Sequence, residues 1–249
     1  METWGFIFSS KLLNNIICDW FYISDFTVMK KFWIVTAMEP EAQIIIDFLG
    51  LELSKSYKNI RIYEKDWYVL AYTWMWKVQA SIWSSILCWE YWIDCLINIW
   101  VAGNLNRNNV KIWDVFLIKE IIQHDMYLPL PWDLSYAKWT IKIPFQSGLN
   151  PDEFNFWFQE NGICVTWDQF IDDPDKASQL RNDFSADVAE MEAYAVAGTA
   201  REFGILDNTV IIKSVSDWAD NDANGWLYSN LDFAMNNGIE ILKRIMGIN

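Results

Sequence analysis

The segment from residue 189 to 220 constrains the fold of this chain more than any other stretch. Small and apolar residues recur at helical spacing from Ala193 to Phe203, which predicts a helix. The β-branched run Thr209–Val215 is typical of a strand buried on both faces of a parallel sheet. This strand ends at Ser216 and Asp217, and open α/β sheets bind ligands at the carboxyl ends of their strands. The segment therefore predicts an α/β fold with a binding site beside these two residues.

Acidic residues stand at both ends of this segment. Glu190 and Glu192 precede the predicted helix, and Asp217 follows the predicted strand. Carboxylates can accept hydrogen bonds from adjacent sugar hydroxyls, or serve as general acids and bases. Asp217 could equally cap its own loop, because aspartate commonly accepts hydrogen bonds from nearby backbone amides in turns. The carboxylates favour acid–base chemistry or a hydroxyl clamp without identifying the reaction.

Length, charge and residue usage exclude several classes of function. The 249 residues suit one α/β domain with a sizeable core. With 19 Lys and Arg against 33 Asp and Glu, the net charge of -14 argues against a nucleic-acid partner. The 4 cysteines form no Cys-x-x-Cys pair, and the single histidine, His124, cannot supply a metal cluster. We therefore predict reduced thiols, a cytoplasmic location and no metal.

The sequence predicts one folded domain over residues 29–249, preceded by an extension over residues 1–28. The extension lacks a basic start and carries charged residues throughout, so it does not resemble a signal peptide. The most apolar region, residues 78–103, is interrupted by Glu90 and Asp94. It therefore predicts no membrane span.

A second acidic cluster follows the first predicted strand. The apolar run Phe32–Ala37 leads through Met38-Glu39-Pro40-Glu41 into a predicted helix over residues 42–49. Proline is favoured where a helix begins, and acidic side chains there complement the helix dipole. The two glutamates would also repel an incoming phosphate, which phosphorolysis needs. This loop favours hydrolysis over phosphorolysis.

The remaining predicted elements alternate between strands and helices. Strands are expected over residues 60–64, 68–73, 93–101, 110–122 and 162–166, and helices over 78–91, from 150 and from 229. We expect these elements to form an α/β three-layer sandwich, with a central mixed β-sheet flanked by helices.

Four motifs occur in order along the chain. They are Ala-Met-Glu-Pro-Glu at 37–41, Asp-Gln-Phe-Ile at 168–171, Glu-Met-Glu at 190–192 and Ser-Asp-Trp-Ala-Asp at 216–220. Together they resemble the nucleoside phosphorylase superfamily, and within it the 5'-methylthioadenosine/S-adenosylhomocysteine nucleosidases. The resemblance spans most of residues 29–249. It implies a phosphorylase/hydrolase-like fold and hydrolysis of an adenine N-glycosidic bond, with no metal or organic cofactor.

The resemblance also implies roles for individual residues. Asp217 would protonate N7 of the leaving adenine, Glu41 would take a proton from the attacking water, and Glu192 would hold the ribose hydroxyls. These roles require Asp217 to be protonated at neutral pH while Glu41 stays ionised, so their environments must separate the two pKa values. The resemblance also places seven further residues around the nucleoside: Met38, Met75, Gly103, Phe170, Ile171, Met191 and Ser216. Ile171 would contact the base through its backbone.

Some positions depart from the family pattern or transfer poorly. Val101 stands where many relatives have serine, which removes a hydroxyl from the water and sugar side of the site. The family has a His-Asp like His124-Asp125, but the resemblance does not make it catalytic. Relatives line the alkylthio pocket partly from a second subunit, which suggests a homodimer. The matching segment, 127–133, is too divergent for residues to be assigned.

Tryptophan is frequent in this chain and glycine is rare. The sequence has 17 Trp and only 10 Gly, and many of the tryptophans stand in turn-like contexts where glycine is usual. Reading them as glycine also restores the family pattern around residues 33, 74, 76, 100, 113 and 167. We therefore predict that most are glycines, encoded by a stop codon that is read as glycine. A protein genuinely rich in tryptophan is the alternative.

Three other functions stay open at this point. A purine nucleoside phosphorylase of the same fold would need phosphate for turnover. A hydrolase acting on another nucleoside, such as futalosine, shares most of these motifs. A non-catalytic nucleoside-binding module, the alternative if the tryptophans at 74, 76 and 100 are present, would bind adenosine analogues without forming product.

Overall fold

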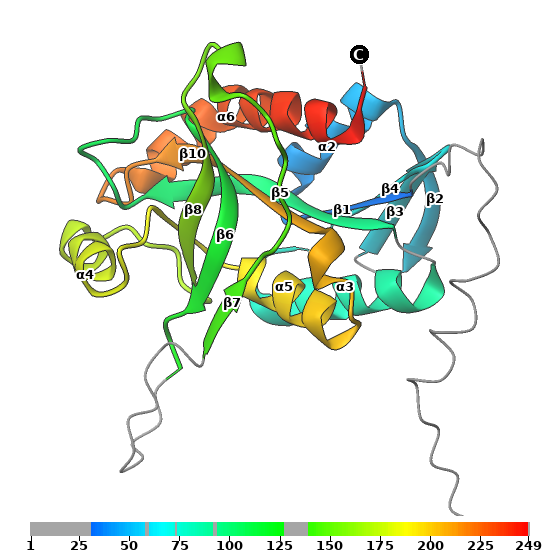
Figure 1. Ribbon diagram of the computed structural model, residues 1–249, viewed down its shortest axis with the longest axis horizontal. Helices are drawn as coiled ribbons and strands as arrows, with labels where there is room; N and C mark the ends of the chain where they lie inside the picture. Colours follow the sequence, from blue (N-terminus) through cyan, green and yellow to red (C-terminus); the bar gives the residue numbers. More distant parts are fainter. Residues whose placement is uncertain (1–30, 58–59, 73, 92–93, 127–138, 249) are drawn as a thin grey trace, which may run out of the picture.

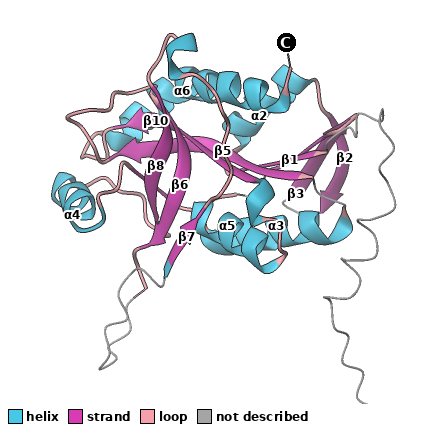
Figure 2. Cartoon of the chain, in the orientation of Figure 1, coloured by secondary structure: helices cyan, strands magenta, loops and turns pink. Residues whose placement is uncertain are grey.

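The computed structural model describes residues 31–57, 60–72, 74–91, 94–126 and 139–248. The predicted extension, residues 1–28, and the segment 127–133 both lie outside the described residues. In the part of the chain that is described, helices cover both faces of a central β-sheet (Figures 1 and 2). None of the described helices is both long and apolar enough to cross a membrane.

The described residues form a 10-stranded sheet. Its strands are β1 (Phe32–Thr36), β2 (Glu52–Tyr57), β3 (Ile60–Lys65), β4 (Tyr68–Tyr72), β5 (Cys95–Asn104), β6 (Val115–Gln123), β7 (Thr140–Lys142), β8 (Phe158–Thr166), β9 (Val188–Glu190) and β10 (Thr209–Asp217). The helices are α2 (Glu39–Leu49), α3 (Lys77–Glu90), α4 (Pro174–Phe184), α5 (Ala193–Glu202) and α6 (Ala223–Met246).

The sheet is mixed and curls on itself around β5 and β10. Neighbouring strands follow the order β10-β6-β8-β9-β5-β1-β4-β3-β2, and β10 also pairs with β5, so five strands close into a ring. β1 and β10 both run parallel to β5, whereas β9 runs antiparallel to it. The register between β10 and β5 shifts between Val215 and Asp217. Such bulges occur next to active sites, where they redirect a side chain.

Two apolar layers explain why the central strands are buried on both faces. On one face, α3 and α5 pack against Val35, Leu96 and Ile211; on the other, α2 and α6 pack against Ile34 and Ile97. Alternate residues of β1 and β5 therefore point into different cores, and both sets must be apolar. The predicted three-layer α/β architecture is confirmed.

The structure corrects the expected elements at several points. The sequence Asn150-Pro151-Asp152 begins only a single 3-10 turn, Pro151–Glu153, so the helix predicted there is wrong. β2 was not predicted, because its residues Glu-Leu-Ser-Lys-Ser-Tyr are mostly polar and it lies at the sheet edge. α4 was not predicted either, although Asp173 caps its first turn by accepting from the Asp175 and Lys176 amides.

Candidate active site

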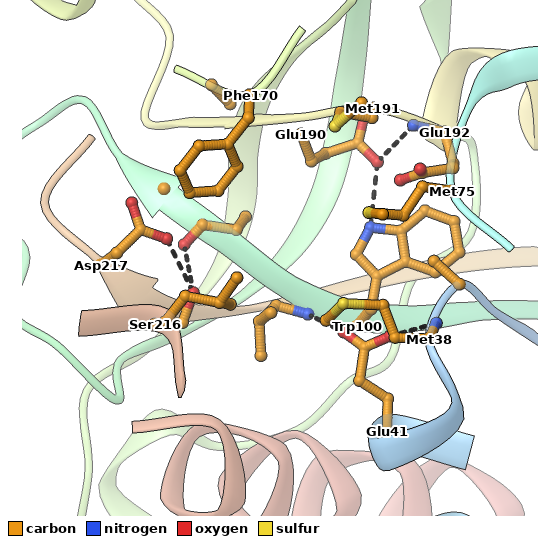
Figure 3. Close-up of a pocket in the computed structure, with 16 residues that line it drawn as sticks. Met38, Glu41, Met75, Trp100, Phe170, Glu190, Met191, Glu192, Ser216 and Asp217 are labelled. Carbon is orange, nitrogen blue, oxygen red and sulfur yellow. Dashed lines mark hydrogen bonds between the residues drawn. The ribbon is translucent and has the colours of Figure 1, made fainter. Parts of the chain in front are cut away.

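A pocket lies at the carboxyl ends of β1, β5 and β10, beside the end of β9 (Figure 3). Its cavity holds about 70 Å³. Its described lining includes all but one of the predicted site residues: Met38, Glu41, Met75, Gly103, Phe170, Met191, Glu192, Ser216 and Asp217. The further lining residues are Ala37, Trp100, Val101, Ala102, Ala189, Glu190 and Leu227. Strands far apart in the sequence thus bring the predicted carboxylates to one cavity.

Glu41 lies buried at the first turn of α2, with its carboxylate held on three sides. Oε2 accepts hydrogen bonds from the Met38 amide at 2.9 Å and the Thr36 hydroxyl at 3.2 Å, and Oε1 accepts from the Val101 amide at 3.2 Å. Burial raises its pKa to about 6, although the hydrogen bonds oppose the shift. The neighbouring Glu39 instead points outward and pairs with Arg61 at 3.1 Å. Only Glu41 of the two can therefore serve the pocket.

Asp217 is fully buried at the end of β10, and its carboxylate is fixed by local donors. The Ala219 amide donates to Oδ1 at 2.9 Å, and the Ser216 hydroxyl donates to Oδ2 at 2.9 Å. A Cβ built on Gly103 would stand 2.9 Å from Oδ1, so a larger residue where β5 passes the carboxylate would displace it. Burial raises the pKa of Asp217 to about 6. The loop-capping contact and the pocket position therefore belong to the same side chain.

Glu192 is the third buried carboxylate, at the beginning of α5. Its Oε1 accepts a hydrogen bond from the Trp76 amide at 2.8 Å, which ties it to the turn before α3. Burial raises its pKa to about 8, and the negative charge of Glu190 adds to this shift. A ligand that donates hydroxyl hydrogens to this carboxylate would favour its ionised form.

Behind Glu192 lies a buried ion pair that the sequence analysis missed. Lys213 of β10 is fully buried, and its Nζ donates to Glu190 Oε2 at 3.0 Å and to Asn98 Oδ1 at 2.8 Å. Burial opposes ionisation of Glu190, but the Lys213 charge and a hydrogen bond from Thr166 outweigh it and lower its pKa. A lysine within the apolar run Val210–Val215 was the available signal, because a buried lysine needs a partner.

The Glu190 carboxylate also holds the beginning of α5. Oε2 accepts hydrogen bonds from the backbone amides of Glu192 at 3.0 Å and Ala193 at 2.8 Å. These amides have no acceptor within the helix, and a negative charge there complements the helix dipole. Lys213 and Glu190 therefore position the backbone that carries Glu192.

Apolar side chains surround the three carboxylates. Met38, Met75 and Met191 are partly buried along the lining, and Phe170 stands at its edge, where it is 36% exposed. Ile171 is the predicted residue that does not line the pocket. Its side chain is buried in a separate cluster around Leu105 and α4, so its predicted backbone contact with the base stays a prediction.

Trp100 fills much of the space between the carboxylates. Its indole Nε1 donates to Glu190 Oε2 at 3.1 Å, and Lys213 Nζ lies 3.7 Å from its ring centroid. In Figure 3 the ring projects into the pocket between Glu41 and Glu190. Pockets that bury drug-sized ligands enclose about 300–1,000 Å³, so the cavity of about 70 Å³ beside Trp100 is small for a nucleoside.

The expected separation of the Glu41 and Asp217 pKa values does not occur in this pocket. Burial dominates both sites and raises each pKa to about 6. His124 lies outside the pocket lining, edge-on to Trp167 with ring centroids 5.0 Å apart. Burial, together with Lys176, lowers its pKa to about 4 and keeps it neutral. Within the described residues, no group of His, Cys, Asp and Glu could hold a metal ion.

Comparison with known proteins supports the likeness seen in the sequence. Residues 31–246 match the phosphorylase superfamily. A 5'-methylthioadenosine/S-adenosylhomocysteine nucleosidase from Tolumonas auensis is 30% identical over 87% of this chain and 98% of the relative. The aminodeoxyfutalosine nucleosidase of Helicobacter pylori is 24% identical over 88% of this chain and 99% of the relative.

A solved structure reproduces the fold. The Helicobacter pylori 5'-methylthioadenosine/S-adenosylhomocysteine nucleosidase with butyl-thio-DADMe-Immucillin-A superimposes with a TM-score of 0.77, at 22% identity, over 88% of this chain and 99% of that one. Fold, motif order and sequence match all agree over the described domain. The chain therefore belongs to the phosphorylase superfamily.

Proposed function

We propose that this protein hydrolyses the N-glycosidic bond of 5'-methylthioadenosine, S-adenosylhomocysteine or a related adenine nucleoside, and releases adenine. The observation that carries the proposal is the meeting of Glu41, Glu192 and Asp217, all buried, at one apolar pocket. The nucleosidase from Tolumonas auensis, which is similar to this chain over 98% of its own length, supports the substrate class.

The three carboxylates divide the reaction between them. Glu192 accepts hydrogen bonds from the ribose hydroxyls, and the purine lies beside Phe170 with its N7 towards Asp217. Asp217 donates its proton to N7 as the bond from the sugar to the base breaks, which leaves a sugar with oxocarbenium character. Glu41 takes a proton from the water that attacks this carbon. Water is thereby added across the bond, and the proton on Glu41 returns to Asp217 through solvent.

The pocket favours water over phosphate as the attacking group. Its described lining contains three buried carboxylates in addition to Glu190 and no arginine or lysine, and carboxylates repel an incoming phosphate. Adenine release should be equally fast with and without phosphate, which chromatography of adenine and of the sugar product measures. A phosphorylated sugar, or turnover only with phosphate, would identify a phosphorylase instead.

A futalosine-type nucleosidase is the second candidate, because the aminodeoxyfutalosine nucleosidase of Helicobacter pylori matches this chain over 88% of its length. A panel of 5'-methylthioadenosine, S-adenosylhomocysteine and aminodeoxyfutalosine distinguishes the two by their kcat/KM values. A higher kcat/KM for aminodeoxyfutalosine would assign the second function. A shift of melting temperature with every ligand but no product would instead show a nucleoside-binding module.

The proposal extends to assembly and location. We propose a homodimer, as the sequence likeness suggests, and light scattering of the purified protein measures its mass. We also propose a cytoplasmic location, supported by Cys88 and Cys164, which the structure holds as thiols. Fractionation of the native cells, with detection of the protein, tests this location.

A further inference from the structure

Three tryptophans have a backbone conformation that suits glycine. The φ angles of Trp74, Trp76 and Trp113 are 72°, 96° and 78°. Half of the described non-glycine residues with positive φ are therefore tryptophans. Left-handed backbone is rare for any residue with a Cβ, and a bulky side chain there is an outlier. The fold requires at these positions a conformation that glycine adopts without strain.

The β3–β4 hairpin has a sequence pattern that also favours glycine. Lys65 pairs with Tyr68, which leaves Asp66 and Trp67 as a two-residue loop, and φ of Asp66 is 52°. Loops of this length favour Asp-Gly, because the turns that match strand twist need positive φ. A glycine in place of Trp67 would complete that sequence pattern, although φ of Trp67 itself is not positive.

Buried indoles conflict with the core as well. Trp33 lies in β1 and Trp83 in α3, where they are 0% and 2% exposed. The Nε1 atom of each is buried without a hydrogen-bond partner. Buried indole N–H groups usually find an acceptor, so these two positions are poorly suited to tryptophan.

Trp100 is the indole that bears on function. It occupies the pocket between the carboxylates that the proposed reaction requires and leaves about 70 Å³ (Figure 3). Glycine at this position would remove the whole indole while leaving the backbone amide of Val101, which donates to Glu41, in place. The same change would remove the ring that separates Lys213 from the pocket, because Lys213 Nζ lies 3.7 Å from its centroid.

We propose that the working protein carries glycine at residues 74, 76, 100 and 113, and that residue 100 decides whether the pocket admits a nucleoside. The codon written as tryptophan at these positions is then read as glycine. Glycine at residues 74, 76 and 113 stands on the backbone angles, and glycine at residue 100 stands on the indole that fills the pocket. The role of residue 100 rests on the proposed function. Residue 100 determines specificity because glycine has no side chain there and leaves room for the nucleoside.

Mass spectrometry of the protein purified from its native source tests the first part. Peptides that span residues 74–76, 100 and 113 should have masses that correspond to glycine at each position. Tryptophan at these positions in the native peptides would overturn the proposal. This measurement needs neither activity nor a refolded variant.

Recombinant variants test the second part. The chain as written should release adenine at least 100-fold more slowly than the triple variant Trp74→Gly, Trp76→Gly, Trp100→Gly, with Trp100→Gly giving most of the gain. Trp89→Gly is the matched control, because Trp89 is 83% exposed on α3 and does not line the pocket. It should leave the rate of the written chain unchanged.

The outcomes separate this inference from the proposed function. Glycine in the native peptides, with no adenine released by the native protein, would uphold the decoding and refute the nucleosidase. Tryptophan in those peptides, with rapid adenine release, would do the reverse. Equal rates for the written chain and Trp100→Gly, at the same melting temperature, would refute the role of residue 100. If Trp100→Gly does not fold, adenine binding to the native protein replaces this comparison. Tryptophan at residue 100 in a native protein that binds adenine would then refute the role.

Discussion

The two ends of the pocket differ in how well their residues suit the local backbone and the cavity. At the Asp217 end, Gly103 gives the carboxylate the space it needs, and Ser216 and the Ala219 amide each donate to it at 2.9 Å. At the Glu192 end, Trp76 holds the carboxylate from a left-handed backbone, and Trp100 fills the cavity. In natural proteins local preferences usually agree with the fold. The Asp217 end also has a residue with positive φ, Ala219 at 50°, but its side chain is small, whereas Trp76 carries an indole. The larger conflict at the Glu192 end therefore indicates the identity of the residues, rather than the architecture, as its cause.

The ion pair behind Trp100 should show the largest effect on stability. Replacing Lys213 by Met leaves Glu190 buried without its cation, which costs about 3–5 kcal/mol for a buried pair. Urea unfolding of the variant measures this loss. Lys142→Met is the control, because its side chain is 80% exposed and its contact with Glu120 is long, at 4.0 Å. Similar stability of the two variants would show that Lys213 does not hold this end of the pocket.

Removing the proton donor at the other end should abolish most activity. In the glycine-bearing triple variant, Asp217→Asn should lower kcat by at least about 100-fold, because asparagine cannot protonate N7. Steady-state adenine release measures the loss. Asp222→Asn is the matched control five residues away, where the side chain is exposed and makes no cap hydrogen bond. A comparable loss in both variants would indicate a structural effect of the loop rather than proton donation.

The pH dependence should link the two ends. Glu41 must be ionised and Asp217 protonated, and burial raises both pKa values to about 6. Activity should therefore peak near pH 6, falling below it as Glu41 gains a proton and above it as Asp217 loses one. Each limb should fall roughly tenfold per pH unit, as expected for one ionisation. In Glu41→Gln, the remaining activity should lack the acidic limb; an acidic limb that persists would assign it to another group.

The smallest effect concerns backbone strain away from the pocket chemistry. At Trp113, with φ of 78°, glycine should be more stable than alanine by about 1–2 kcal/mol. At Trp89, in the last turn of α3, the order should reverse by less than about 1 kcal/mol, because glycine disfavours helices most strongly in their interior. Denaturant unfolding of the glycine and alanine variants at both positions measures these differences in the free energy of unfolding. If glycine were the more stable residue at both positions, or the less stable at both, backbone strain would not explain the preference at Trp113.

The sequence predicted the parts of the fold and site that depend on local pattern. β1, β5 and β10 are apolar runs that end in polar residues, so Glu41 and Asp217 could be placed at strand ends before the structure was known. The family likeness supplied Met75 and Gly103, which local pattern alone would not select. The Gly103 contact with Asp217 gives this glycine its physical reason.

The features that were missed depend on tertiary contacts. Glu190 and Lys213 lie 23 residues apart in the sequence, and the curled sheet brings them together beside Trp100. The turn at Asn150 has the proline and cap of a helix, but the chain enters β8 at Phe158, so only one turn forms. The pKa values of Glu41 and Asp217 follow from burial, which the motifs do not reveal.

The most direct test of the central claim uses protein purified from its native source, so that every codon is read as the cell reads it. Adenine and the free sugar are measured after incubation with 5'-methylthioadenosine in buffer without phosphate. A nucleosidase whose pocket contains Glu41, Glu192 and Asp217 should release both in equal amounts. No adenine from any nucleoside of the panel, or adenine release that begins only after phosphate is added, would contradict the claim.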